Sequence, residues 1–304
     1  MRKNNFEVML IANPIYDIVF KRLMENKRSA KFFIQTLTGE QVEDIAMVPQ
    51  EYTYHAKVKK KKSKKEVTDS KDEWEILSLI RFDFVATIRN DDGGCKKVFI
   101  EIQKTNKPTN LMRFRTYPGE QYKHLDMVEV VSGKVEKALP IISIYLLGFK
   151  LTNIKAAAIK VCRTYIDMIG QTEIKQKNKL IEALTHDGYF VQIPYITGKP
   201  RTLLESLLSI FEQKYFIDEK NTLKEYEYPI EDENLKMMVA ILQHAASDAK
   251  TRREMEESWW AEEDEKEWNK ELQEKNKIIA EKDKSLAEKD KEIAELKRLY
   301  GVKQ

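Results

Sequence analysis

The chain has 304 residues, of which 42% are hydrophobic and 34% charged, so it holds enough apolar material to bury a core. Its 53 Lys and Arg against 50 Asp and Glu give a formal net charge of +3, which excludes a uniformly basic nucleic-acid coat. With only two cysteines, Cys95 and Cys162, a disulfide framework and a cysteine-rich zinc cluster are excluded. The sequence shows no secretory signal pattern, and its longest apolar run, 139–149, is too short to cross a bilayer. We therefore expect a cytoplasmic protein with no membrane partner.

Helical patterns come first along the chain. Asn13 is a suitable helix cap and Pro14 a suitable first-turn residue, and apolar residues at helical spacing follow them. A second helix is expected over 29–38, because Gly39 can end it in the left-handed conformation. The segment 57–65 then holds seven lysines in nine positions, which repel one another and predict a solvated loop.

Two alternating segments, 73–89 and 96–104, flank the turn signal at 91–94 and predict a β-hairpin. Because strand side chains alternate between faces, stacking the apolar residues of the two strands puts Asp83 and Glu101 on one face. A loop of three or five residues would set these two directly opposite each other, with Cβ atoms about 4.5 to 5.5 Å apart.

The rest of the chain falls into distinct regions. After a helical stretch over 109–117, the apolar segment 139–147 predicts a buried central strand. Short strand and helix patterns follow, and from about residue 231 the pattern is that of one long charged helix. We therefore expect a core over 1–150, a small α+β extension over 151–230 that packs on it, and a C-terminal helix over 231–304.

The C-terminal helix contains a seven-residue repeat, because the sequence of 280–284 recurs at 287–291. One face keeps an apolar residue at the same step, at Leu272, Ile279, Leu286, Ile293 and Tyr300. A coiled-coil seam needs a second apolar row three residues after the first. In this chain that row is Lys275, Lys282, Lys289 and Leu296, so only its last member is apolar. Two interpretations stay open: a weak coiled coil that joins copies into a homo-oligomer, or a solvated charged helix.

The predicted pair of acids suggests a metal site. Two carboxylates held opposite each other repel, and a shared divalent cation would remove that repulsion. Oxygen ligands from Asp83, Glu101 and the Ile102 carbonyl, together with waters, suit Mg²⁺ or Mn²⁺. Alternatively, both acids lie on a solvated face and pair with Arg81 or Lys97. Spacing alone leaves both interpretations open.

Several short motifs occur in order along the first 150 residues. They are Asp17-x-x-Phe20-Lys21, Arg81-Phe82-Asp83, Glu101-Ile102-Gln103, Arg113-x-x-x-Tyr117 and Leu139-Pro140-Ile141-Ile142. Together they resemble the PD-(D/E)XK nuclease family transposases, also called recombination-promoting nucleases. The resemblance covers about residues 10 to 150 by motif and extends more loosely through 182–187 and 189–193.

The resemblance implies a restriction-endonuclease-like α/β fold, a mixed sheet flanked by helices, with the metal ligands Asp83 and Glu101 on a central hairpin. It implies a Mg²⁺- or Mn²⁺-dependent endonuclease, a hydrolase that cuts phosphodiester bonds of DNA in recombination or transposition. Gln103 stands where the superfamily usually has lysine, and glutamine can orient water but supplies no charge. The alternative is therefore a weakened or inactive nuclease-fold module that binds DNA or a protein partner.

Other residues would support such a site. By the resemblance, Asp17 would reach the metal through water, and Lys21 is our first candidate to replace the missing lysine. Arg113 and Tyr117 share a helix face and would contact phosphate and orient the site, or else pair with an acid and cap the core. The lysine run would grip the DNA backbone, or else stay solvated. Its candidate contacts are Lys59, Lys60, Lys61 and Lys62.

Overall fold

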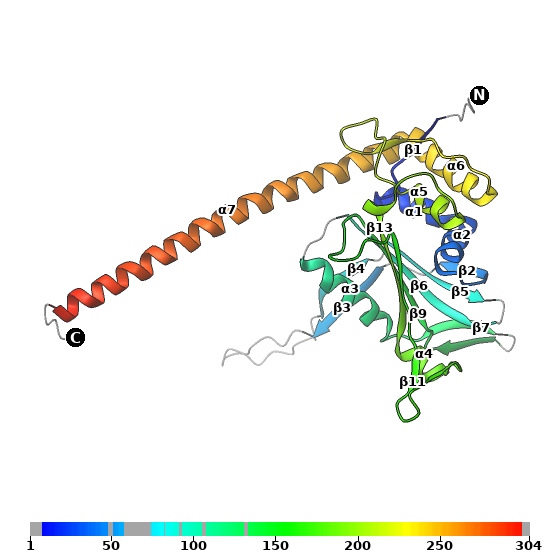
Figure 1. The fold of residues 1–304 in the computed structure, drawn as a ribbon, viewed down its shortest axis with the longest axis horizontal. Coiled ribbons are helices and arrows are strands. Elements are labelled where there is room, and N and C mark those ends of the chain that lie inside the picture. Colours follow the sequence, from blue (N-terminus) through cyan, green and yellow to red (C-terminus); the bar gives the residue numbers. More distant parts are fainter. Residues whose placement is uncertain are drawn as a thin grey trace, which may run out of the picture. The chain divides into compact units, whose positions relative to one another are not determined.

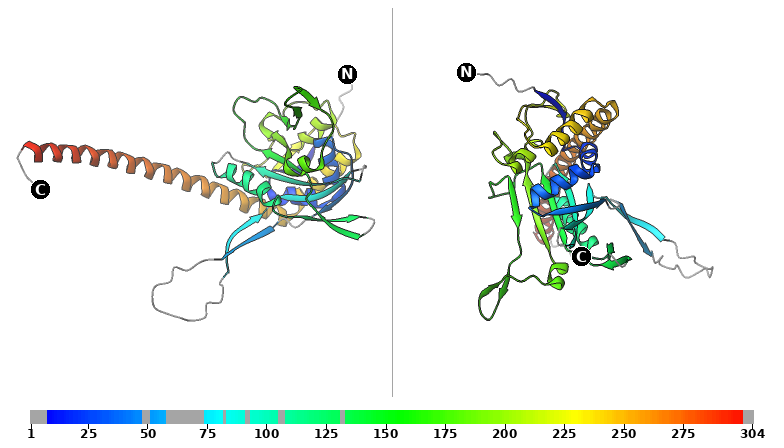
Figure 2. Two further views of the ribbon diagram at one scale, coloured as in Figure 1. Left: turned by 90° about the horizontal axis from the view of Figure 1, so that it is seen from below. Right: turned by 90° about the vertical axis from the view of Figure 1, so that its right-hand side faces the viewer.

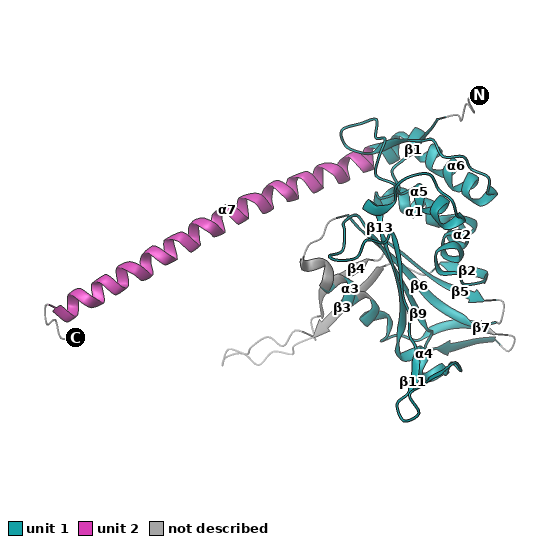
Figure 3. Ribbon diagram, in the orientation of Figure 1, with its two compact units in different colours: residues 1–252 teal, residues 253–304 magenta. Residues whose placement is uncertain are grey.

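The computed structural model describes residues 8–47, 51–57, 74–81, 83–90, 93–104, 108–130 and 133–299. The chain divides into two compact units, residues 1–252 and 253–304, which Figure 3 colours teal and magenta. The first unit contains the sheet and most of the helices, and the second is helical.

A six-stranded mixed sheet is the centre of the first unit (Figure 1). In spatial order its strands are β10 (Ala158–Val161), β13 (His186–Gln192), β9 (Ile141–Leu147), β6 (Cys95–Gln103), β5 (Phe84–Asn90) and β2 (Val42–Met47). β9 runs parallel to both of its neighbours, and the other pairs are antiparallel. Every residue of β9 is buried, as expected for a strand covered on both faces, so the predicted buried central strand is confirmed.

β5 and β6 form the predicted hairpin in the predicted register. Phe84 pairs with Ile100, so Asp83 and Glu101 occupy the next opposing positions. Beyond the last strand pair, the Asn90 N–H donates to the Gly94 carbonyl over 2.8 Å, so the hairpin turns between these two residues. The last loop residue, Gly93, has a φ of 75°, the left-handed conformation that three-residue hairpin loops commonly need.

The strand predicted over 73–89 is in fact two strands. β4 (Trp74–Arg81) pairs with β3 (Glu51–Lys57) in a separate two-stranded ribbon, and β5 begins only at Phe84. Alternation marks extended backbone but does not specify which strand is the partner, so the pattern runs across the break without a signal.

Four helices form a layer on one face of the sheet (Figure 1, Figure 2). They are α1 (Asp17–Glu25), α2 (Lys27–Thr38), α5 (Leu203–Ser209) and α6 (Glu233–Ser247). Their shared core includes the rings of Phe20 and Phe33, whose centroids lie 6.2 Å apart, and of Phe211, which packs against both. The layer is fixed to the sheet where the Tyr189 hydroxyl donates to the Thr38 carbonyl over 3.1 Å.

The ends of the first two helices test the capping predictions. α2 ends at Gly39 as predicted, with a φ of 75° and the glycine N–H bonded to the Gln35 carbonyl. α1 begins at Asp17 and not directly after Asn13. The Asn13 side chain accepts from the Ile15 N–H over 3.2 Å and so closes a turn ahead of the helix.

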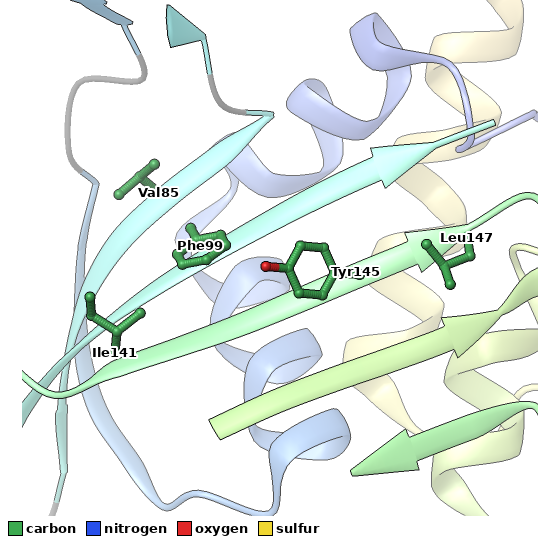
Figure 4. Close-up of a cluster of buried hydrophobic side chains, with 5 residues drawn as sticks. All are labelled: Val85, Phe99, Ile141, Tyr145 and Leu147. Atoms are coloured by element: carbon green, nitrogen blue, oxygen red, sulfur yellow. The ribbon is translucent and has the colours of Figure 1, made fainter. Parts of the chain in front are cut away.

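α3 (Pro108–Gln121) packs on the opposite face of the sheet. There a buried cluster joins three neighbouring strands, and Figure 4 shows it in front of the sheet with the blue helices α1 and α2 behind. Its members are Val85, Phe99, Ile141, Tyr145 and Leu147. Phe114 of α3 covers the cluster, its ring centroid 4.7 Å from that of Tyr145.

The remaining elements of the first unit are short. Three two-stranded ribbons pair β1 (Met9–Ala12) with β14 (Leu223–Tyr226), β7 (Asp126–Val130) with β8 (Gly133–Lys137), and β11 (Tyr165–Asp167) with β12 (Thr172–Ile174). The helix α4 (Lys179–Leu184) and the 3₁₀ turn η1 (Ile193–Tyr195) flank β13.

The compact units differ from the predicted division of the chain. β10 and β13 lie in the same sheet as strands of 1–150, so the segment 151–230 adds two strands to that sheet. α6, which falls within 231–304, contacts α1, α2 and β1. The boundary therefore lies after residue 252.

α7 (Ala249–Leu299) is a helix of 51 residues, so a long C-terminal helix is confirmed. Its predicted start at about residue 231 is wrong, because α6 ends at Ser247 and Asp248 separates the two helices. Every residue from 271 to 299 is exposed. Within the part of the chain that the structure describes, no helix combines the length and apolar content needed to cross a membrane.

Candidate functional site

Asp83 lies at the bend where the chain enters β5. Its Oδ2 accepts a hydrogen bond from the backbone N–H of Ile102 over 2.6 Å. The carboxylate thus takes the position of a backbone acceptor at the end of the β5–β6 ladder. Hydrogen bonds to an ionised acceptor are stronger than neutral ones, so this contact fixes the carboxylate against β6.

Glu101 is completely buried, with 0% of its surface exposed. It lies on β6 between β5 and β9, where its partner on β9 is Tyr145. Strand alternation puts it on the same face as Phe99 and the buried cluster. A carboxylate is costly to remove from water unless charge or hydrogen bonds compensate it. The predicted alternative, a solvated Glu101, is therefore wrong.

Tyr145 presents a neutral hydroxyl near Glu101. Burial raises the pKa of Tyr145 to about 12, and the negative charge of Glu101 acts in the same direction, whereas a hydrogen bond with Ser143 lowers it. The hydroxyl donates to the Phe114 carbonyl over 3.4 Å. Tyr145 therefore keeps its proton at neutral pH and adds no second negative charge beside Glu101.

Gln103 lies two residues beyond Glu101 on β6 and shares its face. Its side-chain Oε1 is buried and has no hydrogen-bond partner among the residues that the structure describes. The Gly148 N–H donates to the Gln103 carbonyl over 2.8 Å. A Cβ on Gly148 would lie 2.6 Å from the Lys104 carbonyl oxygen, so only glycine lets the end of β9 approach β6 this closely.

These residues fit a hard divalent cation. Mg²⁺ and Mn²⁺ prefer oxygen ligands, and Mg²⁺ sites commonly use one or two carboxylates and several waters. Asp83 and Glu101 supply the carboxylates, and Gln103 adds a buried carbonyl oxygen without a described partner. Within the described ranges, no cluster of three His, Cys, Asp or Glu side chains could hold a metal. An ion here would therefore depend on the two carboxylates, the Gln103 amide oxygen and water.

The structure places the predicted residues of the first helix on the other face. Asp17 and Lys21 form an ion pair with each other, Nζ to Oδ2 2.8 Å. They belong to α1, which lies behind the sheet when the cluster is in front (Figure 4). Lys104 also extends to this side, its Nζ 3.7 Å from the centroid of the Tyr16 ring. These contacts give no support to Lys21 as the replacement for the missing lysine.

The predicted DNA contacts are described only in part. α3, the helix that carries Arg113 and Tyr117, lies over the face of the sheet that holds Glu101, because Phe114 of this helix packs on the cluster. The side chains of Arg113 and Tyr117 lie outside the described residues, so their roles stay predictions. The lysines predicted to grip DNA also lie outside that range, and they are Lys59, Lys60, Lys61 and Lys62.

One feature of this face was missed by sequence reasoning. Lys97, also on β6, is buried and forms an ion pair with Asp126 at the start of β7, Nζ to Oδ1 2.5 Å. The predicted alternative in which Lys97 neutralises Asp83 or Glu101 is therefore wrong. Alternation gives the inward direction of Lys97, but no sequence signal indicates that its partner lies 29 residues away.

Comparison of the chain with protein-family models, with curated proteins and with solved structures finds no match. The functional assignment therefore depends on the geometry and the motifs given above.

Proposed function

We propose that the chain is a metal-dependent DNA endonuclease of the PD-(D/E)XK type, related to the nucleases of recombination or transposition. The observation that most strongly supports this is a fully buried Glu101 in register with Asp83 on the central hairpin of a mixed sheet. Helices on both faces of that sheet agree with the restriction-endonuclease-like fold that the motifs imply. The reaction is hydrolysis of a phosphodiester bond.

The residues of the site would have different roles in this reaction. Mg²⁺ or Mn²⁺, bound by Asp83 and Glu101, would supply a water of lowered pKa and neutralise charge on the scissile phosphate. Asp83 is held in a fixed orientation by the Ile102 N–H, which limits the reorganisation needed on binding. Gln103 would orient a water through its amide group without adding positive charge. DNA would be held by Arg113 and the lysine run through phosphate contacts.

A second candidate function follows from Gln103. Where lysine is replaced by glutamine, the charge that stabilises the developing phosphate charge is lost. Lys21 does not restore it in the described contacts, because it pairs with Asp17. The chain would then be a module of the same fold that binds DNA or a protein partner and cuts slowly or not at all.

Plasmid cleavage by the purified full chain, with Mg²⁺, with Mn²⁺ and with chelator, separates the two candidates. We expect metal-dependent nicking or cutting by the unmodified chain. Asp83→Asn and Glu101→Gln should each reduce the rate about 100-fold or more, because each removes a charged metal ligand while preserving side-chain volume. Binding without cleavage would favour the second candidate.

The matched control is Glu173→Gln, the same substitution at an exposed position of β12. It should cleave at the unmodified rate. Because Glu101 is buried, circular dichroism must show that Glu101→Gln is folded before its activity is compared. Unchanged cleavage by Asp83→Asn and Glu101→Gln would remove both residues from the mechanism.

A further inference from the structure

The distal part of α7 leaves a row of apolar side chains in water. From residue 271 to 299 every position is exposed. The apolar residues at the seven-residue step are 45 to 58% exposed, and they are Leu272, Ile279, Leu286 and Ile293. Such a row on one face of a long helix is the usual contact surface of a helix partner.

The seam has two unlike halves. The apolar row occupies one of its two positions, and the other begins with Trp268, ends with Leu296 and is lysine between them. The three lysines are Lys275, Lys282 and Lys289. Trp268 and Leu296 are both more than half exposed, 64% and 51%, so the seam is apolar at both ends and charged in the middle of one row.

This pattern determines the direction in which two identical helices can pair. In a parallel pair, equivalent positions face each other, so each lysine would meet the same lysine of the other copy in the seam. In an antiparallel pair, each residue of one row faces a residue of the other row. The lysines then meet apolar side chains, and the like-charge contacts disappear.

One antiparallel register aligns the whole seam. If Leu272 of one copy lies opposite Leu296 of the other, Ile279 faces Lys289 and Leu286 faces Lys282. By symmetry the same pairs form at the other end, so both ends of the contact are Leu–Leu. The aliphatic part of each lysine would cover an apolar residue while its ammonium group stays in water.

Acidic residues stand beside the lysine row. Asp283 and Asp290 follow Lys282 and Lys289 directly in the sequence, at the position that flanks this side of the seam. In the antiparallel register, Lys282 of one copy lies between Asp283 and Asp290 of the other. The aspartates of the two copies also approach each other on this side of the seam, and the lysines between them offset that repulsion.

We propose that residues 268–299 of α7 bind the same segment of a second copy as an antiparallel coiled coil. The occupant is a second copy because the seam complements itself in one register, with apolar ends, lysine against apolar residues and lysine beside aspartate. This inference is independent of the nuclease proposal, because it uses no residue of the site around Glu101.

Light scattering on the full chain measures the mass in solution. We expect about twice the 35.8 kDa of one chain. Ile279→Asp combined with Leu286→Asp should return the mass to that of one chain. The matched control is Ala280→Asp with Ala287→Asp, which adds the same charge to the outer face and should leave the dimer intact. A single-chain mass for the unmodified protein, or loss of the dimer in the control alone, would overturn the proposal.

Cysteine cross-linking tests the direction. In a background with Cys95→Ser and Cys162→Ser, Leu272→Cys chains mixed with Leu296→Cys chains should form a disulfide-linked pair. Neither variant alone should cross-link, because its cysteines would lie at opposite ends of the seam. Efficient cross-linking of Leu272→Cys with itself would mean parallel pairing and would contradict the proposed register.

Discussion

Lys224 is a buried lysine that lines a small pocket with Glu212, Tyr226 and Tyr228. It lies on β14, only 2% exposed, and its Nζ donates to the backbone carbonyl of Glu212 over 2.5 Å. Burial lowers the pKa of Lys224 to about 7, although the nearby Glu212 carboxylate acts in the opposite direction. The neighbouring hydroxyls of Tyr226 and Tyr228 keep their protons, because burial raises the pKa of both.

Stability should therefore rise with pH above neutrality. In the unfolded chain Lys224 has the ordinary pKa of 10.5, whereas in the folded chain its pKa is about 7, so it is protonated there only below about pH 7. Between these values the unfolded state binds more protons, so the free energy of unfolding increases with pH by at most about 1.4 kcal/mol per pH unit from this group. Urea denaturation at pH 7, 8 and 9 measures the slope.

Lys224→Met should remove this contribution to the slope and stabilise the fold at pH 7, where the charged lysine is most costly. Lys199→Met, at an exposed position, should leave the slope unchanged. If Lys224→Met and the unmodified chain show the same pH dependence, Lys224 is ordinarily protonated in the folded state and the assignment of its pKa is wrong.

For single residues, the sequence predicts the sheet face on which a side chain lies better than it predicts the residue with which that side chain pairs. Alternation predicted that Asp83 and Glu101 share a face, and the observed pairing of Phe84 with Ile100 makes these two the next opposing positions. It could not give the burial of Glu101, which depends on α3 packing on that face and on β9 lying beside β6 in the sheet. The pairing of Lys97 with Asp126 likewise depends on tertiary packing. Lys21 has more than one acidic residue within reach on its own helix, and the structure shows that it pairs with Asp17.

At the scale of elements, the junction of β6 and β9 depends on Gly148. Gly148→Ala should destabilise the chain by about 1 to 3 kcal/mol, because the new Cβ would overlap the Lys104 backbone and push the two strand ends apart. The displacement would also move Gln103, whose carbonyl is bonded to Gly148, so DNA cleavage or binding should fall with stability. Urea denaturation gives the change in free energy.

Gly119→Ala is the control for this change. It lies in α3, where an added Cβ meets no atom within 4 Å, and alanine favours a helix by about 0.5 to 1 kcal/mol over glycine. We therefore expect equal or greater stability. Equal stability of Gly148→Ala and the unmodified chain would show that the β6–β9 junction tolerates separation.

Elements whose signals are local were predicted well. The hairpin turn, the buried strand β9 and the glycine end of α2 each follow from a few adjacent residues. The division of 73–89 into β4 and β5 was missed, because both strands alternate and nothing in the alternation shows a change of partner. The start of α1 was placed too early, because Asn13 uses its side chain in a turn.

At the scale of the whole molecule, segments that are far apart in the sequence pair as neighbouring strands. β13 lies beside β9 although the two strands are far apart in the chain, and β1 pairs with β14 near residue 226. Pairings over such separations leave no periodic signal, which is why the predicted boundary at residue 150 does not separate compact units. To form these pairings, the chain must close long loops during folding, and the entropy cost of that closure slows folding.

In the proposed metal centre, Asp83 and Glu101 hold one divalent cation. Electron paramagnetic resonance of Mn²⁺ titrated into the full chain tests it directly, because bound Mn²⁺ loses the sharp signal of the free ion. We predict one bound Mn²⁺ per chain, retained in Glu173→Gln and lost in both Asp83→Asn and Glu101→Gln. Absence of Mn²⁺ binding by the unmodified chain, or binding by both site variants equal to that of the unmodified chain, would contradict the proposed metal centre.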